Sequence, residues 1–483
     1  MSNKAILKNF ASYGIGSIVT LILGFLTNPI ITRMIDPIEY GKYSMFTLFT
    51  SVSLLIVVFG LDQSFVRFFY ERNEDLRGNL LLYCLKFAII VNIVFSICLI
   101  LFYKKVTLYL FQIESLELII LIIVSNFILL FNRYSLLVIR MQQKALLYSL
   151  MQILQKVAFL FLFLSLIFSF ESNFKVLIYA SIVTNIIVTL LSIYFEKRFW
   201  KTTFISFNPG LSSSTKNEML KFGTPLIFTS LITWIFQSID RIFINKYSGF
   251  EELGIYSAAF TIIVLLNALQ TTFTTFWVPV AYEKYAINKN EKNFFEVVNR
   301  AITLSMFYIS ILLILFKDFI VYLLGSDYRE AAFIMPFLIF MPLLYTISET
   351  TVLGINFMKK AKYHIYIAVV SCVVSVILNI VFVPTFGAKG AAFSTAISYF
   401  VFFTLRTIIS KKLYNLNYSL SKFYICIAFI SIYALYSSFN KIDVTIIFLA
   451  FFNISLVTIF YWKDINYALT KIKPYIHKNI IRK

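Results

Sequence analysis

Seven charged side chains interrupt long apolar stretches of the sequence, where a charge is costly if those stretches cross a membrane. They are Asp62, Lys86, Arg133, Lys156, Asp240, Arg241 and Glu349. A charge at the centre of a bilayer costs about 2.5–3.5 kcal/mol. Seven facing lipid would cost on the order of 20 kcal/mol, more than the roughly 5–15 kcal/mol that stabilises a typical domain. Most must therefore face the interior, form pairs or reach the interface.

The basic members of this set are predicted to bind an anionic substrate. Lys156 lies about 17 Å along its apolar stretch, farther than a lysine stem of about 6 Å can reach. Gln152 recurs on the same helical face as Lys156. Arg133 offers a planar fork of donors that suits phosphate. We therefore interpret Lys156, Arg133, Lys86 and Gln152 as candidate substrate-binding residues.

Each of the three cations also has a structural alternative. Lys156 can pair with a carboxylate inside the helical bundle, and Arg133 can pair with Asp62 or Glu349. Lys86 lies only about 10 Å into its stretch, so snorkelling to the interface nearly accounts for it.

The other charges are predicted to act in gating or coupling. They are Asp62, Arg67, Asp240, Arg241 and Glu349. Asp62 and Arg67 lie near one end of an apolar stretch, and Asp240 and Arg241 lie near the end of another. The alternative is that Asp62 pairs with Arg67, and Asp240 with Arg241, in ion pairs that serve only the structure.

The elements that position these residues are predicted to be membrane-spanning helices. Of the 483 residues, 60% are hydrophobic and 14% are charged, with a mean hydropathy of +0.83. A soluble chain has more polar surface than this, so the composition predicts an all-α polytopic membrane protein. About twenty apolar residues cross a bilayer, and fourteen such runs occur, near 10–32, 43–66, 79–103, 116–139, 145–170, 175–195, 220–245, 254–281, 300–323, 331–357, 363–385, 389–409, 421–439 and 443–462.

Lysine and arginine in the loops predict the orientation of these spans. With the N-terminus inside, the cytoplasmic segments hold 29 of the 43 basic residues and the external loops hold 10. This bias predicts that both termini are cytoplasmic. The net charge of +20 is then largely a topology signal that also suits an anionic inner leaflet, and no nucleic-acid partner is expected. No cleaved signal peptide is indicated at the N-terminus.

An internal repeat relates the two halves of the chain. A shift of 213 residues aligns IITRMIDPIEYGKYS, which begins at Ile30, with the segment that ends at Ser257. It places Glu39 on Glu252 and Tyr43 on Tyr256. Both copies begin on the same side, so the repeats run parallel. We predict an N-lobe at 1–197 (spans 1–6), a cytoplasmic linker at 198–217, a C-lobe at 218–412 (spans 7–12), a helix pair at 413–462 and a basic tail at 463–483.

The repeat gives the two lobes different charges. A shift of 216 residues places Arg133 on Glu349, so opposite charges occupy equivalent positions and are predicted to meet across a central cleft as a gate. At mid-depth the N-lobe offers Lys86, Arg133 and Lys156, whereas the C-lobe offers Glu349 alone. A cationic cavity suits a pyrophosphate group, which is costly to desolvate unpaired.

No cofactor, metal or catalytic centre is predicted. The four cysteines lie in apolar runs without CxxC spacing, and the two histidines are too few for a metal cage. GxxxxGK[ST] is absent, and the short loops leave little room for an enzyme domain.

The runs TNPIITRMIDPIEYGKYSMFTLF, GLDQSFVRFFYE and SIDRIFINKYSGFEELGIYSAAF resemble polysaccharide-export flippases of the multidrug/oligosaccharidyl-lipid/polysaccharide flippase superfamily. The resemblance implies fourteen spans in two lobes and an alternating-access transporter of the bacterial cytoplasmic membrane. It implies that undecaprenyl-pyrophosphate-linked oligosaccharides are moved to the outer leaflet for O-antigen or another polysaccharide, alongside a polymerase and chain-length machinery. A cation-coupled multidrug exporter on the same fold is the alternative, and an enzyme is a more distant one.

Overall fold

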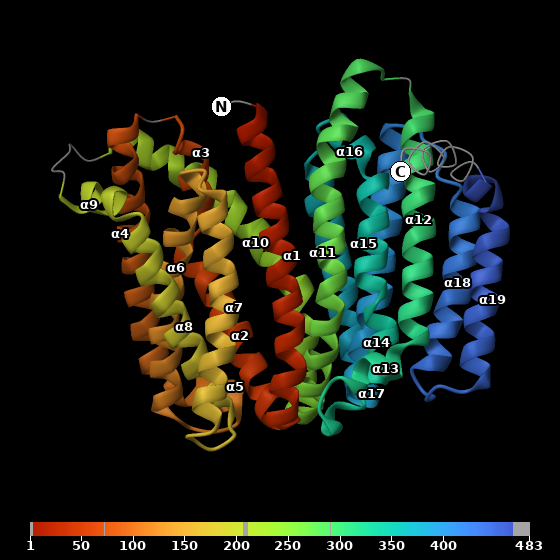
Figure 1. The fold of residues 1–483 in the computed structure, drawn as a ribbon, viewed down its shortest axis with the longest axis horizontal. Coiled ribbons are helices and arrows are strands. Elements are labelled where there is room, and N and C mark those ends of the chain that lie inside the picture. Colours follow the sequence, from red (N-terminus) through yellow and green to blue (C-terminus); the bar gives the residue numbers. More distant parts are fainter. Residues whose placement is uncertain (1–2, 72, 206–210, 290, 467–483) are drawn as a thin grey trace, which may run out of the picture. The chain divides into compact units, whose positions relative to one another are not determined.

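The protein is an all-helical polytopic membrane protein, as the composition predicts. The computed structural model describes residues 3–71, 73–205, 211–289 and 291–466, and no strand occurs in these ranges (Figure 1). Residues 206–210 of the predicted linker and 467–483 of the predicted basic tail lie outside them.

The chain folds as two compact units, Met1–Ser238 and Ile239–Lys483. The first unit contains α1 (Asn3–Met34), α2 (Pro37–Val58), α3 (Leu61–Phe68), α4 (Glu74–Leu101), α5 (Tyr103–Phe111), α6 (Leu116–Met141), α7 (Ala145–Ile167), α8 (Phe174–Phe195), α9 (Lys197–Ile205) and most of α10 (Ser213–Tyr247). The boundary between the units falls inside α10, and the predicted lobe, linker and helix-pair limits stay predictions.

The second unit holds the remaining helices. They are α11 (Gly249–Ile287), α12 (Lys292–Leu315), α13 (Lys317–Tyr322), a 3-10 turn (Ser326–Tyr328), α14 (Ala331–Leu338), α15 (Phe340–Thr351), α16 (Leu353–Phe357), α17 (Lys362–Leu413), α18 (Leu420–Ser437) and α19 (Val444–Phe460).

Every predicted span overlaps a helix of the structure. By length and apolar composition, 11 helices of the described chain can cross a membrane, or 12 if the bent α11 is one span. Two further features bear on the count: α17 has 52 residues with a non-helical break at Gly387, and α19 has 17 residues. The number fourteen stays a prediction.

Capping residues in the sequence account for several helix starts. Asp36 accepts a hydrogen bond from the backbone N–H of Glu39 at 3.0 Å, and Pro37 occupies the first turn of α2. Asp443 caps α19 in the same way, through the N–H of Ile446 at 2.7 Å. These contacts satisfy backbone donors that have no partner within the helix.

The internal repeat recurs as a pair of matching contacts. The carboxylate of Glu39, in the first turn of α2, accepts from the N–H of Phe174 at the start of α8, at 2.9 Å. The aligned Glu252 of α11 accepts from the N–H of Ala388, directly after the break in α17, also at 2.9 Å. In each unit a carboxylate thus binds the start of a helix, where the helix dipole favours negative charge.

Close backbone contact joins α3 to the first half of α10. Gly60 precedes α3 with φ +72°, and a Cβ there would lie 2.4 Å from the carbonyl oxygen of Gly223. The hydroxyl of Ser64 donates to the carbonyl of Met219 at 2.7 Å. Gly60 is therefore required twice, for its left-handed backbone and for this contact.

Candidate functional site

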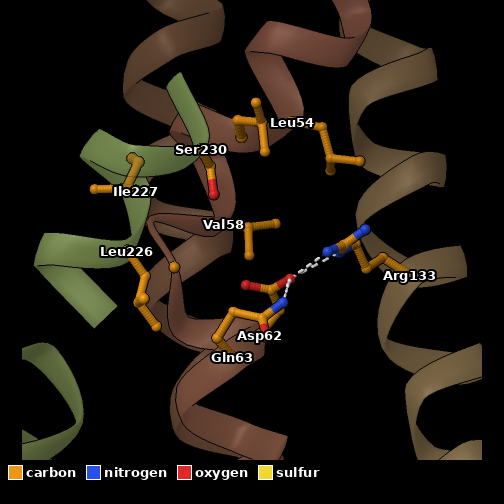
Figure 2. A pocket seen from close by; sticks show the side chains of 10 residues that line it. Leu54, Val58, Asp62, Gln63, Arg133, Leu226, Ile227 and Ser230 are labelled. Atoms are coloured by element: carbon orange, nitrogen blue, oxygen red, sulfur yellow. Dashed lines mark hydrogen bonds and ion pairs between the residues drawn. The ribbon is translucent and has the colours of Figure 1, made fainter. Parts of the chain in front are cut away.

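An ion pair between α3 and α6 forms the centre of the candidate site in the first unit. The Arg133 guanidinium donates through Nε to the Asp62 carboxylate at 3.0 Å and through a second nitrogen to the same oxygen. Gln63 donates to that oxygen at 3.3 Å (Figure 2). The Asp62 side chain is 7% exposed, whereas that of Arg133 is 42% exposed. The acid is therefore buried, and the guanidinium remains open on one side.

Two cavities adjoin this pair. One of about 60 Å³ is lined by Asp62 and Arg133 together with Leu226, Ile227 and Ser230 of α10 (Figure 2). A larger one of about 230 Å³ is lined by the same pair and by Asn132, Arg140 and Tyr148. Arg133 and Arg140 lie seven residues apart on α6, so the larger cavity has two arginines on one wall.

Helix α7 extends the polar lining. Gln152 donates to the Tyr148 hydroxyl at 3.2 Å, so it adjoins the larger cavity through Tyr148. Lys156 follows one turn farther along the same face, is exposed, and lies within 4.0 Å of the position of a Cβ on Gly24 of α1. No ion pair of Lys156 is present within the described part of the chain, and its substrate-binding role stays a prediction.

Lys86 lies on a different kind of surface. It is exposed on α4, in line with the exposed side chains of Ile90, Ile93 and Ile97. Such a stripe is typical of a lipid-facing surface. This position favours the snorkelling alternative for Lys86.

Arg67 does not pair with Asp62, contrary to the structural alternative in the sequence analysis. Asp62 binds Arg133 instead, while Arg67 lies 3.7 Å from Glu71 one turn on and above the Phe222 ring at 5.3 Å. The reason is the helical spacing, since residues five apart point to different faces of α3. A gating role for Arg67 stays a prediction.

The second unit contains a buried pair that the sequence analysis missed. Arg406 of α17 donates to the Glu349 carboxylate of α15 at 2.8 Å and to the Ser348 hydroxyl at 2.6 Å. Both charged side chains are 8% exposed. The expectation that Glu349 is the only mid-depth charge of the second half is therefore wrong. The hydropathy pattern ends the span near residue 409, close to Arg406, whereas α17 continues to Leu413.

The predicted gate between Arg133 and Glu349 stays a prediction. In this structure each residue has a partner in its own unit, Asp62 for Arg133 and Arg406 for Glu349. The two equivalent positions of the repeat thus hold different ion pairs. The Asp62–Arg133 pair is partly exposed, whereas the Glu349–Arg406 pair is buried.

Asp240 is held by neutral donors. Its carboxylate accepts from the Tyr256 hydroxyl at 2.9 Å, from the Asn379 amide at 2.8 Å and from the Thr395 hydroxyl. Arg241 lies above the Phe260 ring at 4.5 Å. The three donors to Asp240 come from α11 and α17. The structural alternative, a direct Asp240–Arg241 pair, stays a prediction.

The residues that complete these sites carried weak signals in the sequence. Tyr148, Asn379 and Thr395 are neutral side chains in apolar runs, and only their spacing from other polar residues could have marked them. Tyr256 was visible as the repeat partner of Tyr43, although its contact with Asp240 was not.

Comparisons with known families match both halves of the chain. The family model described as "Polysaccharide biosynthesis protein" matches residues 6–284. The model described as MatE matches residues 225–385. A search of curated proteins found no match.

Solved structures show the same fold at low sequence identity. The lipid II flippase MurJ in an inward closed conformation has a TM-score of 0.69 at 15% identity, over 94% of this chain and 99% of that one. An inward-facing multidrug resistance MATE family transporter has a TM-score of 0.64 at 16% identity, over 82% and 97% of the two chains. A transporter from Pyrococcus furiosus, noted for the reverse polarity of its binding pocket, has a TM-score of 0.59 at 16% identity, over 84% and 95%.

Proposed function

Because the chain belongs to the polysaccharide biosynthesis protein family of the multidrug/oligosaccharidyl-lipid/polysaccharide flippase superfamily, we propose that it translocates undecaprenyl-pyrophosphate-linked oligosaccharides across the bacterial cytoplasmic membrane. The sugar units would serve surface polysaccharide biosynthesis, with a polymerase and chain-length machinery acting after the flippase. Transport would proceed by alternating access, with both termini cytoplasmic.

The open Arg133–Arg140 wall is the observation that carries this proposal. A pyrophosphate needs several fixed donors because its desolvated charges are costly to leave unpaired. Two arginines on one cavity wall, with Tyr148 in the same lining, supply such donors. Asp62 neutralises part of this charge and keeps Arg133 ordered in the absence of substrate. Lys156 adds a further cation one turn beyond Gln152.

The Arg133, Lys156 and Lys86 variants test this assignment through surface glycan, with membrane abundance of the protein as the control. We expect Arg133→Ala and Lys156→Ala to abolish export at normal abundance. Lys156→Arg should retain part of the export, because the positive charge at this position matters more than the shape of the side chain. Lys86→Ala is the matched lysine comparison and should export normally, given its lipid-facing stripe. Full export by Lys156→Ala would return that lysine to a structural role.

Asp240 is the residue that we propose for energy coupling. A buried carboxylate whose hydrogen-bond donors are neutral gains from binding a proton or a monovalent cation, since either offsets its desolvation cost. Asp240→Asn should therefore preserve the fold and its three hydrogen bonds in part, while export loses its dependence on the ion gradient. Unchanged gradient dependence in this variant would remove Asp240 from the coupling mechanism.

A cation-coupled multidrug exporter is the second candidate. The MatE match over residues 225–385 and the buried Asp240 favour it. The arginine wall opposes it, because a cationic drug would meet like charge there. Drug resistance conferred by expression of the wild-type chain, without an effect on surface glycan, would support the exporter.

A further inference from the structure

The short helix α9 lies where two long apolar helices of the first unit have their ends. It begins directly after the apolar span Phe174–Phe195, and it packs beside the first turns of the span Arg77–Leu101 (Figure 1). A Cβ on Gly78 would lie 2.8 Å from the Thr203 hydroxyl oxygen, so α9 and α4 are in close contact. A helix that adjoins the ends of two membrane spans lies at the depth of the lipid headgroups.

One face of α9 holds it against the rest of the first unit. Trp200 and Thr203 are buried, and the Phe199 ring lies 6.2 Å from that of Phe69. These three residues of α9 are one, three and four positions apart, so they share a side of the helix. The helix is therefore fixed in place and presents its opposite face to the surroundings.

The exposed face of α9 carries cations and no acid. Lys197, Arg198 and Lys201 are all exposed, and the helix sequence KRFWKTTFI has no acidic residue. Within the described ranges, none of these three cations forms an ion pair. The adjoining Glu196 is buried and lies 2.6 Å from the Lys144 ammonium. The positive charge of this face is therefore left for an anion from outside the chain.

Exposed aromatic side chains flank the three cations. Tyr194, Phe195 and Phe204 are 63%, 51% and 61% exposed. The Lys197 ammonium lies 5.4 Å from the Tyr194 ring, and the Phe204 ring stacks on that of Trp200 at 6.0 Å. Cations next to aromatic rings are typical of helices that lie in a membrane interface. A soluble phosphate or an acidic peptide would neutralise the cations but leave these rings in water.

We propose that the exposed face of α9 binds anionic phospholipids at the membrane surface, with their phosphates at Lys197, Arg198 and Lys201 and the flanking rings among the headgroups. The predicted topology places this face on the cytoplasmic side, where the leaflet carries the anionic lipids. Helix α9 forms the first part of the predicted linker between the lobes, so lipid binding holds that part at the membrane. The site uses no residue of the arginine wall and does not rest on the proposed transport substrate.

Tryptophan fluorescence of the full-length protein in nanodiscs tests the proposal. Phe204→Trp places a fluorophore on the exposed face, and the protein without this substitution gives the background of the four native tryptophans. The nanodiscs contain equal amounts of phosphatidylglycerol and phosphatidylcholine, and one of the two lipids at a time has brominated acyl chains, which quench tryptophan. We expect quenching to report a preference of about tenfold for phosphatidylglycerol beside α9.

A charge-neutral variant separates the headgroup contact from the apolar contact. It combines Lys197→Gln, Arg198→Gln and Lys201→Gln with Phe204→Trp. We expect the preference to fall about tenfold, to equal quenching by the two lipids. Quenching itself should persist, because the rings that contact the bilayer remain. Elution volume and melting temperature of each protein in detergent exclude misfolding as the cause.

A matched variant controls for the loss of three positive charges. It combines Lys104→Gln, Lys105→Gln and Lys175→Gln with Phe204→Trp. The first two lysines lie just beyond the far end of α4 and the third lies in the first turn of α8, at the end opposite to α9. This variant should keep the full preference for phosphatidylglycerol at the added tryptophan.

Four results would overturn the proposal. Equal quenching by the two lipids in the Phe204→Trp protein would show that α9 does not select anionic headgroups. A preference that survives the charge-neutral variant would remove the three cations from the contact. Loss of the preference when inorganic phosphate is added at constant ionic strength would assign the cations to a soluble phosphate. An added tryptophan that neither brominated lipid quenches would place the exposed face of α9 in water.

Discussion

Two ion pairs of the structure differ in burial, which decides how much an ion pair matters for stability. The Glu349–Arg406 pair is more buried than the Asp62–Arg133 pair. The Glu349–Arg406 pair is closed on both sides, and Arg406 also lies above the rings of Tyr345 and Phe402. Arg133 instead has 42% of its side chain exposed. We expect the first pair to act in folding and the second to act in binding.

A double-mutant cycle on Glu349 and Arg406 tests this division. Glu349→Gln or Arg406→Gln alone leaves a buried charge without its partner, and each should cost roughly 3–5 kcal/mol of stability. The double variant should cost less than the sum, with a coupling energy of about 1–3 kcal/mol. Thermal unfolding in detergent is the measurement. Additive losses would show that the two side chains are not coupled, and would reopen the predicted pairing of Glu349 with Arg133.

The sequence identified the charged residues of the site better than it identified their partners. Charges such as Arg133 and Asp62 stand out in apolar runs because membrane insertion penalises them. Arg406 is harder to recognise because it lies near the end of the predicted span 389–409, where basic residues are common. Tyr148 and Thr395 have no such penalty, and only packing of distant helices brings them to the charges.

The helix break at Gly387 lies next to Glu252, one of the residues that the internal repeat conserves in type. Gly387 has φ +57°, and a Cβ there would lie 2.9 Å from the Glu252 carboxylate. That carboxylate binds the N–H of Ala388. The break thus leaves the N–H of Ala388 without a partner in its own helix, and the Glu252 carboxylate accepts from it. Glu39 does the same for Phe174 in the other repeat.

Gly387→Ala should lower the stability of the protein by about 1–3 kcal/mol, because the side chain is disfavoured at positive φ and crowds Glu252. Gly14→Ala is the matched control, since no atom within 4 Å would meet its Cβ, and it should be neutral or slightly stabilising. The melting temperatures of both variants in detergent give the comparison. A Gly387→Ala protein as stable as the Gly14→Ala protein would contradict the strained geometry.

At the scale of the whole molecule, hydropathy predicted the helical class, and every predicted span overlaps a helix of the structure. Hydropathy reports the transfer of side chains between water and lipid, which depends on local sequence. The break of α17 at Gly387 falls in the gap between the predicted spans 363–385 and 389–409. The unit boundary inside α10 was not predicted, because it depends on packing between helices. The repeat was visible where it preserved residue types, as at Glu39 and Glu252.

Reporter fusions test the predicted topology. We expect reporters after Lys201, Lys289 and Lys412 to be cytoplasmic and those after Lys105, Lys246 and Lys441 to be external, because 29 basic loop residues lie on one side and 10 on the other. Two or more reporters on the wrong side would refute the fourteen-span arrangement. Expression of each fusion at comparable levels is the control.

Translocation by the purified protein tests the proposed function most directly. The protein is reconstituted into vesicles with a fluorescent oligosaccharide on undecaprenyl pyrophosphate, and a membrane-impermeant quencher reports how much label reaches the outer leaflet. The account predicts translocation by the wild-type protein and by Lys86→Ala, and none by Arg133→Ala at equal reconstitution. Equal translocation by the wild-type and Arg133→Ala proteins, or transport of a cationic drug with no movement of the lipid-linked sugar, would contradict it.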